Sequence, residues 1–319
     1  MMRIVSLLAS ATEMVAALGC TGQLVGRSHE CDYPPEVQRL PVLSRPVIDI
    51  STSSAGIDAQ VRQLAGRRQT GDEAALQALS IYQIDVARLQ ELRPDVILTQ
   101  TQCEVCAVSE RDVSEAIRQL TGLQPRIVSL APYRLSDVWE DLRRVGAALG
   151  RAAEAEALIA GYQQRLEELG QRCARLSAGR GQAPRVAVLE WLDPLMGAGN
   201  WTPELIVYAG GEPVLSASGQ HAPWISWDEL RQVDPEVLIL SPCGFDLERT
   251  RQDAVLLQQH PFWPELRAVR EGRVYLIDGN QYLNRSGPRL VESAELIARA
   301  LWGERAGRAL PAEGWQPLH

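Results

Sequence analysis

The amino-acid sequence predicts an α/β protein in which one long interdomain helix joins two Rossmann-like parallel-sheet lobes. Short apolar strands alternate with amphipathic helices along the chain, which is the pattern of parallel sheets with helices on both faces. A helix–Pro–acid–strand unit occurs twice, as ARLQELRPDVILTQ over residues 87–100 and as DELRQVDPEVLILSP over residues 228–242. Between the two copies, almost every residue from 135 to 176 favours helix.

The first lobe is expected to begin with a strand at 3–10 and a helix at 11–19, which Gly19 ends. Residues 44–80 show the least regular pattern, and we interpret them as an inserted lid or excursion. The further elements expected in this lobe are a strand at 23–28, a helix–turn–strand unit at 81–100, a helix at 108–122 and a strand at 125–132.

The second lobe is expected to contain strands at 184–191 and 271–278 around its own copy of the repeated unit, and a closing helix at 288–302. Gly150 and Arg151 divide the intervening helical stretch, so that its second helix runs over about Arg151–Ser177. A helix of ~25 residues spans nearly 40 Å and suits a rigid strut. The predicted domains are therefore 1–133, a helical connection at 134–178, 179–303 and a weakly structured tail at 304–319.

The composition limits the classes of function. The chain has 319 residues, which is enough for about two domains. Its 45% hydrophobic and 23% charged residues are typical of a soluble globular protein. The formal net charge of −8 argues against a general nucleic-acid binder. We find no Ser-His-Asp or Walker pattern, so no catalytic site is predicted.

The compartment is judged from the first residues and from the cysteines. No stretch approaches the ~20 apolar residues of a membrane span. Arg3 is followed by about six mostly apolar residues, Ile4 to Ala9, which is shorter than the ~7–15 of a signal peptide. We therefore expect a cytoplasmic protein with its six cysteines reduced, and a periplasmic or extracellular one only through an unrecognised export route.

Two short motifs carry metal-ligand residue types. SHECDYPPEV, residues 28–37, offers His29 and Cys31, and TQCEVCAVS, residues 101–109, offers Cys103 and Cys106. Both follow strands expected to be neighbours, so the four side chains are predicted to lie close together. Three thiolates and an imidazole suit tetrahedral zinc. A redox pair of Cys103 and Cys106, a disulfide in an exported protein, and neutral thiols that line a pocket remain open alternatives.

Several stretches resemble one family of binding proteins. They are SLLASATEMVAALG, VGRSHECDYPPEV, LRPDVIL, GGEPVL, APWISWDEL, VDPEVLIL and RSGPRLVESAELIARAL. Together they are similar to the helical-backbone class of ABC-transporter substrate-binding proteins, and within it to the cobalamin-binding branch. The resemblance covers residues 3–303, with 44–80 poorly matched.

The resemblance implies a ligand-binding protein that holds a corrinoid between two lobes, without catalysis and without a required cofactor. The ligand would lie against loops at the carboxyl ends of the strands. Trp224 matches an aromatic corrinoid contact of the family, and a tyrosine expected on the first-lobe loop is replaced by Glu30. The ligand-binding residues that this implies are Ser10, Thr12, His29, Glu30, Gln100, Trp191, Trp224, Tyr282 and Arg285.

The resemblance also bears on a permease partner. Importers of this class dock through a carboxylate on each lobe, whereas here the first position falls near Ala87 and the second near Asp228 or Glu229. The missing charge makes an ABC permease a doubtful partner. The alternative functions are a cytoplasmic metal-binding or thiol-redox protein that uses the His29/Cys31/Cys103/Cys106 cluster, or binding of another metal chelate such as haem or a siderophore.

Overall fold

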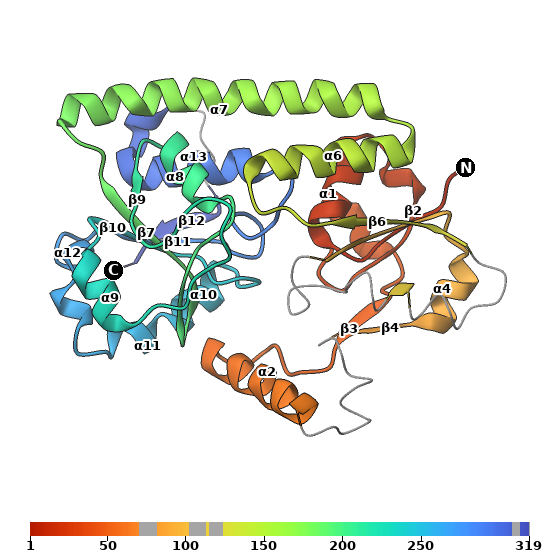
Figure 1. Cartoon of the computed structure of the whole chain (residues 1–319), viewed down its shortest axis with the longest axis horizontal. Coiled ribbons are helices and arrows are strands. Elements are labelled where there is room, and N and C mark those ends of the chain that lie inside the picture. Colours follow the sequence, from red (N-terminus) through yellow and green to blue (C-terminus); the bar gives the residue numbers. More distant parts are fainter. Residues whose placement is uncertain (70–81, 102–112, 115–123, 308–312, 319) are drawn as a thin grey trace. The chain divides into compact units, whose positions relative to one another are not determined.

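The computed structural model describes residues 1–69, 82–101, 113–114, 124–307 and 313–318 (Figure 1). Packing divides the chain into two compact units, which we describe separately. The first unit comprises Met1–Thr52, Gly56–Pro132 and Ser136–Ile159, and the second comprises Ser53–Ala55, Tyr133–Leu135 and Ala160–His319.

The first unit is built on a four-stranded, fully parallel sheet in the order β2-β1-β5-β6. Val5, Leu89 and Ile97 lie wholly buried in its core. Helix α1 begins directly after β1, and Arg93 ends α4 with a left-handed φ of 42° before Pro94. The elements are β1 (Ile4–Ser6), α1 (Ala9–Ala17), η1 (Thr21–Gln23), β2 (Leu24–Arg27), η2 (Pro35–Arg39), α4 (Val86–Leu92), β5 (Val96–Gln100), β6 (Arg126–Leu130) and α6 (Leu135–Leu149).

The region expected to be an irregular excursion contains ordered structure. Strands β3 (Ser44–Pro46) and β4 (Tyr82–Ile84) pair antiparallel as a separate two-stranded sheet. Helix α2 (Ser54–Gln69) lies between them in the sequence. We call β3 and β4 the ribbon, because they bring two side chains to the loop that follows β2.

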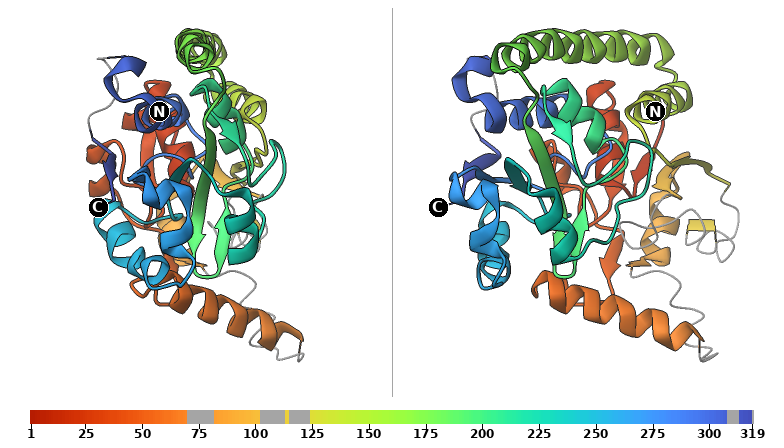
Figure 2. Two further views of the ribbon diagram at one scale, coloured as in Figure 1. Left: turned by 90° about the vertical axis from the view of Figure 1, so that its left-hand side faces the viewer. Right: turned by 60° about the vertical axis from the view of Figure 1, so that its left-hand side comes forward.

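The long helix predicted over Arg151–Ser177 is α7, which runs without interruption from Ala152 to Arg180 (Figure 2). Its residues up to Ile159 pack with the first unit and those from Ala160 with the second. Within the second unit, the Arg165 guanidinium lies 3.0 Å from carboxylate oxygens of Glu292 and Glu295. The predicted fold class is therefore confirmed. None of the described helices has the length and apolar character needed to cross a bilayer.

The second unit contains a sheet in the order β12-β11-β10-β7-β8, with β9 paired to β7. Strands β7, β9, β10 and β11 run parallel, and β8 and β12 are antiparallel to their neighbours. Leu189, Leu238 and Leu276 from the three central strands are wholly buried. The strands are β7 (Arg185–Leu192), β8 (Leu195–Gly197), β9 (Glu212–Pro213), β10 (Val237–Leu240), β11 (Val274–Ile277) and β12 (Trp315–Pro317).

Helices lie on both faces of this sheet (Figure 2). Asp234 ends α9 with a φ of 38° before Pro235, as Arg93 does in α4, so the repeated sequence unit has the same local structure twice. The helices of this unit are α8 (Thr202–Tyr208), α9 (Trp227–Val233), α10 (Leu247–Asp253), α11 (Val255–Gln258), η3 (Trp263–Glu265), α12 (Arg267–Arg270), α13 (Leu290–Trp302) and η4 (Gly303–Ala306).

The tail was expected to be weakly structured, and that expectation is wrong for its last described residues. Strand β12 pairs antiparallel with β11, and Trp315 packs against Tyr275 at 5.6 Å between ring centroids. Gly314 lies directly against the Tyr282 ring, where a Cβ atom would fall 2.3 Å from a ring carbon. The local sequence did not indicate this strand, because its stabilising contacts come from β11.

Candidate functional site

The carboxyl ends of parallel strands are where ligands bind in open α/β sheets, and each unit has such an edge. We call these edges the first rim and the second rim. On the first rim, Ser10 and Thr12 lie in the opening turn of α1 and are buried. His29, Glu30 and Cys31 follow β2, and the buried Gln100 ends β5.

Cys31 is enclosed by the first unit. Its side chain is 0% exposed, and its Sγ accepts a hydrogen bond from Thr12 Oγ1 at 3.0 Å. Ser28 Oγ lies 3.3 Å from the same sulfur, and the thiol is 3.8 Å from the carbonyl oxygen of Ser6. Burial raises the pKa of the thiol, so Cys31 is a protonated side chain that fixes the loop to β1 and α1.

His29 is held by the ribbon. Its Nδ1 lies 2.9 Å from Ser44 Oγ, which also accepts a hydrogen bond from the His29 backbone N–H at 3.2 Å. The ring packs against Tyr82 with 5.0 Å between centroids. Burial, and secondarily the nearby Arg27 guanidinium, lower the pKa of His29 to about 4. The imidazole is therefore neutral at neutral pH.

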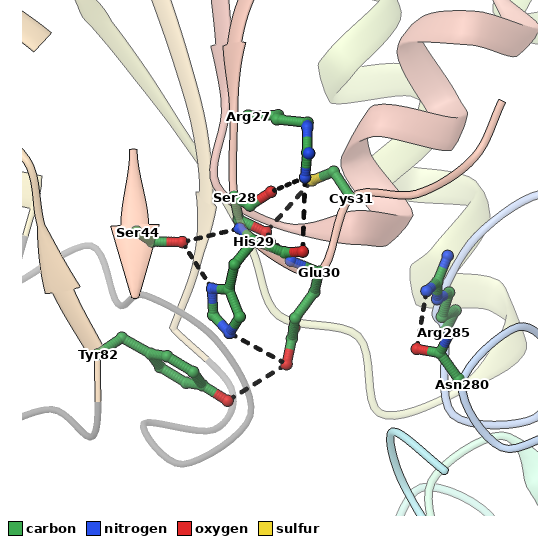
Figure 3. Close-up of polar contacts among 9 residues, drawn as sticks. All are labelled: Arg27, Ser28, His29, Glu30, Cys31, Ser44, Tyr82, Asn280 and Arg285. Carbon is green, nitrogen blue, oxygen red and sulfur yellow. Dashed lines mark hydrogen bonds and ion pairs between the residues drawn. The ribbon is translucent and has the colours of Figure 1, made fainter. Parts of the chain in front are cut away.

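The Glu30 carboxylate lies next to both Tyr82 and His29. Tyr82 Oη donates a hydrogen bond to Glu30 Oε1 at 3.3 Å, and His29 Nε2 is 3.9 Å from the same oxygen (Figure 3). The Glu30 side chain is 32% exposed. The first rim thus presents a carboxylate that a buried tyrosine orients.

The predicted four-donor metal site remains untested. Cys103 and Cys106 lie outside the described residues, so both their proximity to Cys31 and a zinc site stay predictions. Within the described part of the chain, no group of three or more His, Cys, Asp or Glu side chains could hold a metal ion. The contacts of Cys31 favour the alternative of a neutral thiol.

The second rim is rich in aromatic and arginine side chains. Trp191 at the end of β7 packs edge-on against Phe245, with 5.5 Å between centroids. The guanidinium carbon of Arg249 lies over the Phe245 ring, 3.6 Å from its centre. This arrangement gives the rim apolar surface with a cation at its border.

Trp224 is the most exposed aromatic side chain of this rim. It is 56% exposed, although its backbone is ordered by an antiparallel bridge to Met196. On either side, Pro223 O accepts from Gly197 N–H at 2.9 Å and Ile225 N–H donates to Leu195 O at 3.0 Å. A large apolar face is therefore held in solvent by fixed backbone.

The loop after β11 carries Tyr282 and Arg285. Arg285 is buried, and its Nη2 donates to Asn280 Oδ1 at 3.0 Å (Figure 3). Tyr282 lies under the Arg289 guanidinium at 5.4 Å from the ring centre. Asn284 Nδ2 donates a hydrogen bond to the carbonyl oxygen of Ser241, the residue that follows β10, at 2.8 Å.

Sequence reasoning missed three residues of these rims. Ser44 and Tyr82 reach the first rim from the ribbon, and no local pattern indicates either contact. Glu190, one residue before Trp191, accepts from Gly199 N–H at 3.4 Å, and burial raises its pKa to about 7. A single carboxylate that ends the apolar run VAVLE was the available signal for Glu190.

The chain folds into two α/β units that share one long helix, and each unit has a sheet edge of the kind at which ligands bind. This combination defines a substrate-binding protein of the helical-backbone class. The chain belongs to the periplasmic binding protein family, which its residues 4–281 match. A protein of Pectobacterium atrosepticum named vitamin B12-binding protein is 25% identical over 303 residues, covering 94% of this chain and 88% of that protein.

Solved structures agree on the fold. The crystal structure of a periplasmic haem-binding protein from Pseudomonas aeruginosa has a TM-score of 0.73 and 21% identity, covering 99% of this chain and 98% of that one. The periplasmic vitamin B12-binding protein BtuF of Vibrio cholerae has a TM-score of 0.62 and 19% identity, covering 94% of this chain and 96% of that one. The metal-binding or thiol-redox alternative gains no support from this family.

The expectation of a cytoplasmic protein is wrong, because family members are periplasmic binding proteins. That expectation was drawn from the short apolar run Ile4–Ala9. In the structure Ile4–Ser6 form β1, the wholly buried strand at the centre of the first sheet. Because these residues form a buried strand, the fold alone accounts for their apolar character. The short apolar run therefore gives no information about export.

Proposed function

We propose that this protein binds a corrinoid, cobalamin or a relative, and makes or breaks no bond. The observation that carries the proposal is Trp224, an ordered aromatic side chain of which more than half is exposed at the second rim. A corrin is a large, partly apolar disc, and an exposed indole offers it a rigid face at low entropic cost. The name of the Pectobacterium relative supports the same ligand.

The predicted site residues take two roles in this proposal. We assign direct contacts to the side chains with accessible surface, namely His29, Glu30, Trp191, Trp224 and Tyr282. The other predicted residues are buried and would support the rims without touching the ligand. Thr12, for example, donates a hydrogen bond to Cys31. These buried residues are Ser10, Thr12, Gln100 and Arg285.

We do not propose that the protein delivers its ligand to an ABC permease. On α9, Asp228 and Glu229 are both exposed, and Glu229 forms a capping box with Ser226. On α4, Ala87 offers no charge at the corresponding place.

Haem is the second candidate ligand. The haem-binding protein from Pseudomonas aeruginosa resembles this chain over nearly its whole length, and a porphyrin is also a flat, apolar, metal-containing disc. The neutral His29 imidazole would suit the metal of either macrocycle.

Calorimetric titration of the purified protein with hydroxocobalamin, cobinamide and haem tests the function. We expect saturable 1:1 binding of a corrinoid, with haem binding more weakly. Tighter binding of haem would replace corrinoid by haem as the ligand, and the absence of heat with all three would reject the proposal. Metal analysis of the same sample tests the zinc prediction separately.

A further inference from the structure

Glu190 occupies an irregular position at the second rim. On β7, Leu189 and Trp191 pair with Gly197 and Met196, so that two steps along β7 match one step along β8. Glu190 is therefore the extra residue of a β-bulge. Bulges redirect a side chain and are common beside binding sites. This bulge places a carboxyl group next in the sequence to Trp191, to which the proposed function assigns a ligand contact.

Glu190 is held at both its backbone and its side chain. Its carbonyl oxygen accepts a hydrogen bond from Cys243 N–H at 3.1 Å, and its Oε2 accepts one from Gly199 N–H at 3.4 Å. Gly199 in turn lies against Ala222, where a Cβ atom would fall 2.5 Å from the Ala222 backbone nitrogen. Ala222 precedes Trp224 by two residues. The carboxyl group therefore contacts the loop that packs against the segment carrying Trp224.

The surroundings of this carboxyl group favour its protonated form. Glu190 is partly buried, and within the described part of the chain its side chain accepts from Gly199 N–H and forms no ion pair with a guanidinium. Burial without a neighbouring cation disfavours a charged carboxylate, and the pKa of Glu190 accordingly rises to about 7. Below that pH the side chain is a carboxylic acid, which offers both an O–H donor and a carbonyl acceptor.

A carboxamide is complementary to this pair of groups. Its N–H donates to the carbonyl oxygen of the acid, which has a second lone pair beside the one used by Gly199, and its own oxygen accepts from the acid O–H. The peripheral side chains of cobalamin and cobinamide are carboxamides. We propose that Glu190 is a specificity-determining residue of the second rim, which pairs with one peripheral carboxamide of a corrinoid. The inference rests on the proposed function and deepens it.

The test keeps the corrin ring and changes its periphery. Kd values are measured by calorimetry at about pH 6, below the pKa of Glu190, for dicyanocobinamide and for dicyanocobyrinic acid heptamethyl ester, whose ester groups accept hydrogen bonds but cannot donate them. Glu190→Leu should weaken cobinamide binding about 25-fold, because two hydrogen bonds are lost, and ester binding only about fivefold, because one is lost. Glu190→Gln should leave both Kd values within about threefold of wild type, since its amide also donates and accepts.

Two further variants make the result specific. Glu212→Gln removes an exposed carboxylate beside the other end of β7, where Glu212 pairs with Arg185 in the sheet, and should change either Kd less than about twofold. Glu190→Ala removes the same donor and acceptor as Glu190→Leu without adding a branched side chain, so the comparison does not depend on the folding of one variant. Thermal unfolding without ligand shows which variants are folded.

Equal weakening of the two ligands by Glu190→Leu and Glu190→Ala, as a purely structural role would give, would overturn the inference while the proposed function stands. No weakening of cobinamide would overturn it as well. Binding by Glu190→Gln as weak as that by Glu190→Leu would also overturn it, because a donor and acceptor at this position would then have no effect. Failure of the wild type to bind cobinamide and the ester would overturn the proposed function and the inference together.

Discussion

Each unit carries a cysteine just after a parallel strand, and the two thiols have opposite surroundings. Cys31 follows β2 and is wholly buried among Thr12, Ser28 and Ser6, whereas Cys243 follows β10 and is exposed. The cysteine that follows a parallel strand is therefore enclosed by other side chains on the first rim and exposed on the second.

The two rims also differ in the side chains that other segments of the chain contribute to them. The ribbon supplies Ser44 and Tyr82 to the first rim, so that its polar groups find fixed partners. The second rim instead exposes Trp224 and places arginines over the Phe245 and Tyr282 rings. Polar contacts between side chains therefore dominate the first rim, whereas the second rim exposes more apolar surface.

The largest difference between the rims should appear when each cysteine is replaced by aspartate. Cys31→Asp places a carboxyl group in a closed core and should cost about 3–5 kcal/mol, because the group loses its hydration without gaining a cation. Cys243→Asp should cost less than ~0.5 kcal/mol, as exposed substitutions usually do. Urea unfolding at pH 7 followed by circular dichroism measures both. Similar losses at the two positions would contradict the contrast in burial.

The apolar role of the second rim is tested at Trp224. Trp224→Ala should weaken corrinoid binding by about 1–3 kcal/mol, roughly 5- to 150-fold in Kd, since buried aromatic anchors dominate binding energies. Val207→Ala is the matched control, because Val207 is an exposed apolar residue on α8 of the same unit. An unchanged Kd for Trp224→Ala would remove this residue from the ligand contacts.

The rims should also differ in the sign of their pH dependence. The pKa of His29 is lowered from 6.5 to about 4, so the unfolded chain takes up the proton first, and stability is lost as pH falls from 6.5 towards 4. The pKa of Glu190 is raised from 4.5 to about 7, so the unfolded chain gives up its proton first, and stability is lost as pH rises from 4.5 to 7.

Differences between wild type and variants isolate these two groups from Asp141, whose pKa burial also raises to about 7. His29→Gln should remove about 1–2 kcal/mol of the stability loss between pH 6.5 and 4. Glu190→Gln should remove about 1–2 kcal/mol of the stability loss between pH 4.5 and 7. Thermal melts from pH 4 to pH 8 measure both. Slopes of the same sign for the two variants would show that the assignments are wrong.

The smallest expected effect concerns the ribbon. Ser44→Ala removes the partner of His29 Nδ1 and of its backbone N–H, and should cost about 1 kcal/mol of unfolding free energy. Ser51→Ala removes a hydroxyl that bonds only the exposed Asp49 in the described contacts, and should cost less. Equal shifts of the urea midpoint would mean that the ribbon does not stabilise the first rim.

The sheets and the long helix could be predicted because their patterns repeat over many residues. The repeated unit at 87–100 and 228–242 gives the same capped helix, left-handed turn and buried strand in both units. The ribbon and β12 could not be predicted, because strands of three residues carry almost no periodicity and depend on distant partners.

The candidate site shows the same limit. His29, Glu30 and Trp224 stood out through motifs and resemblance, whereas Ser44 and Tyr82 lie 15 and 52 positions from the residues they contact. Contacts over such separations are set by how the strands pair, which the local sequence does not encode. The burial of Cys31 was also not evident from its motif, which indicates only a residue type suited to metals.

Strand β12 has a consequence for self-association. It is three residues long and, among the described strands, pairs with β11 alone. Its removal would leave the backbone of Val274–Ile277 as an open sheet edge. A short edge strand paired with one neighbour is the kind of element that two copies can exchange in a domain-swapped dimer. Preparations kept at high concentration are therefore where exchanged dimers of this protein should be sought.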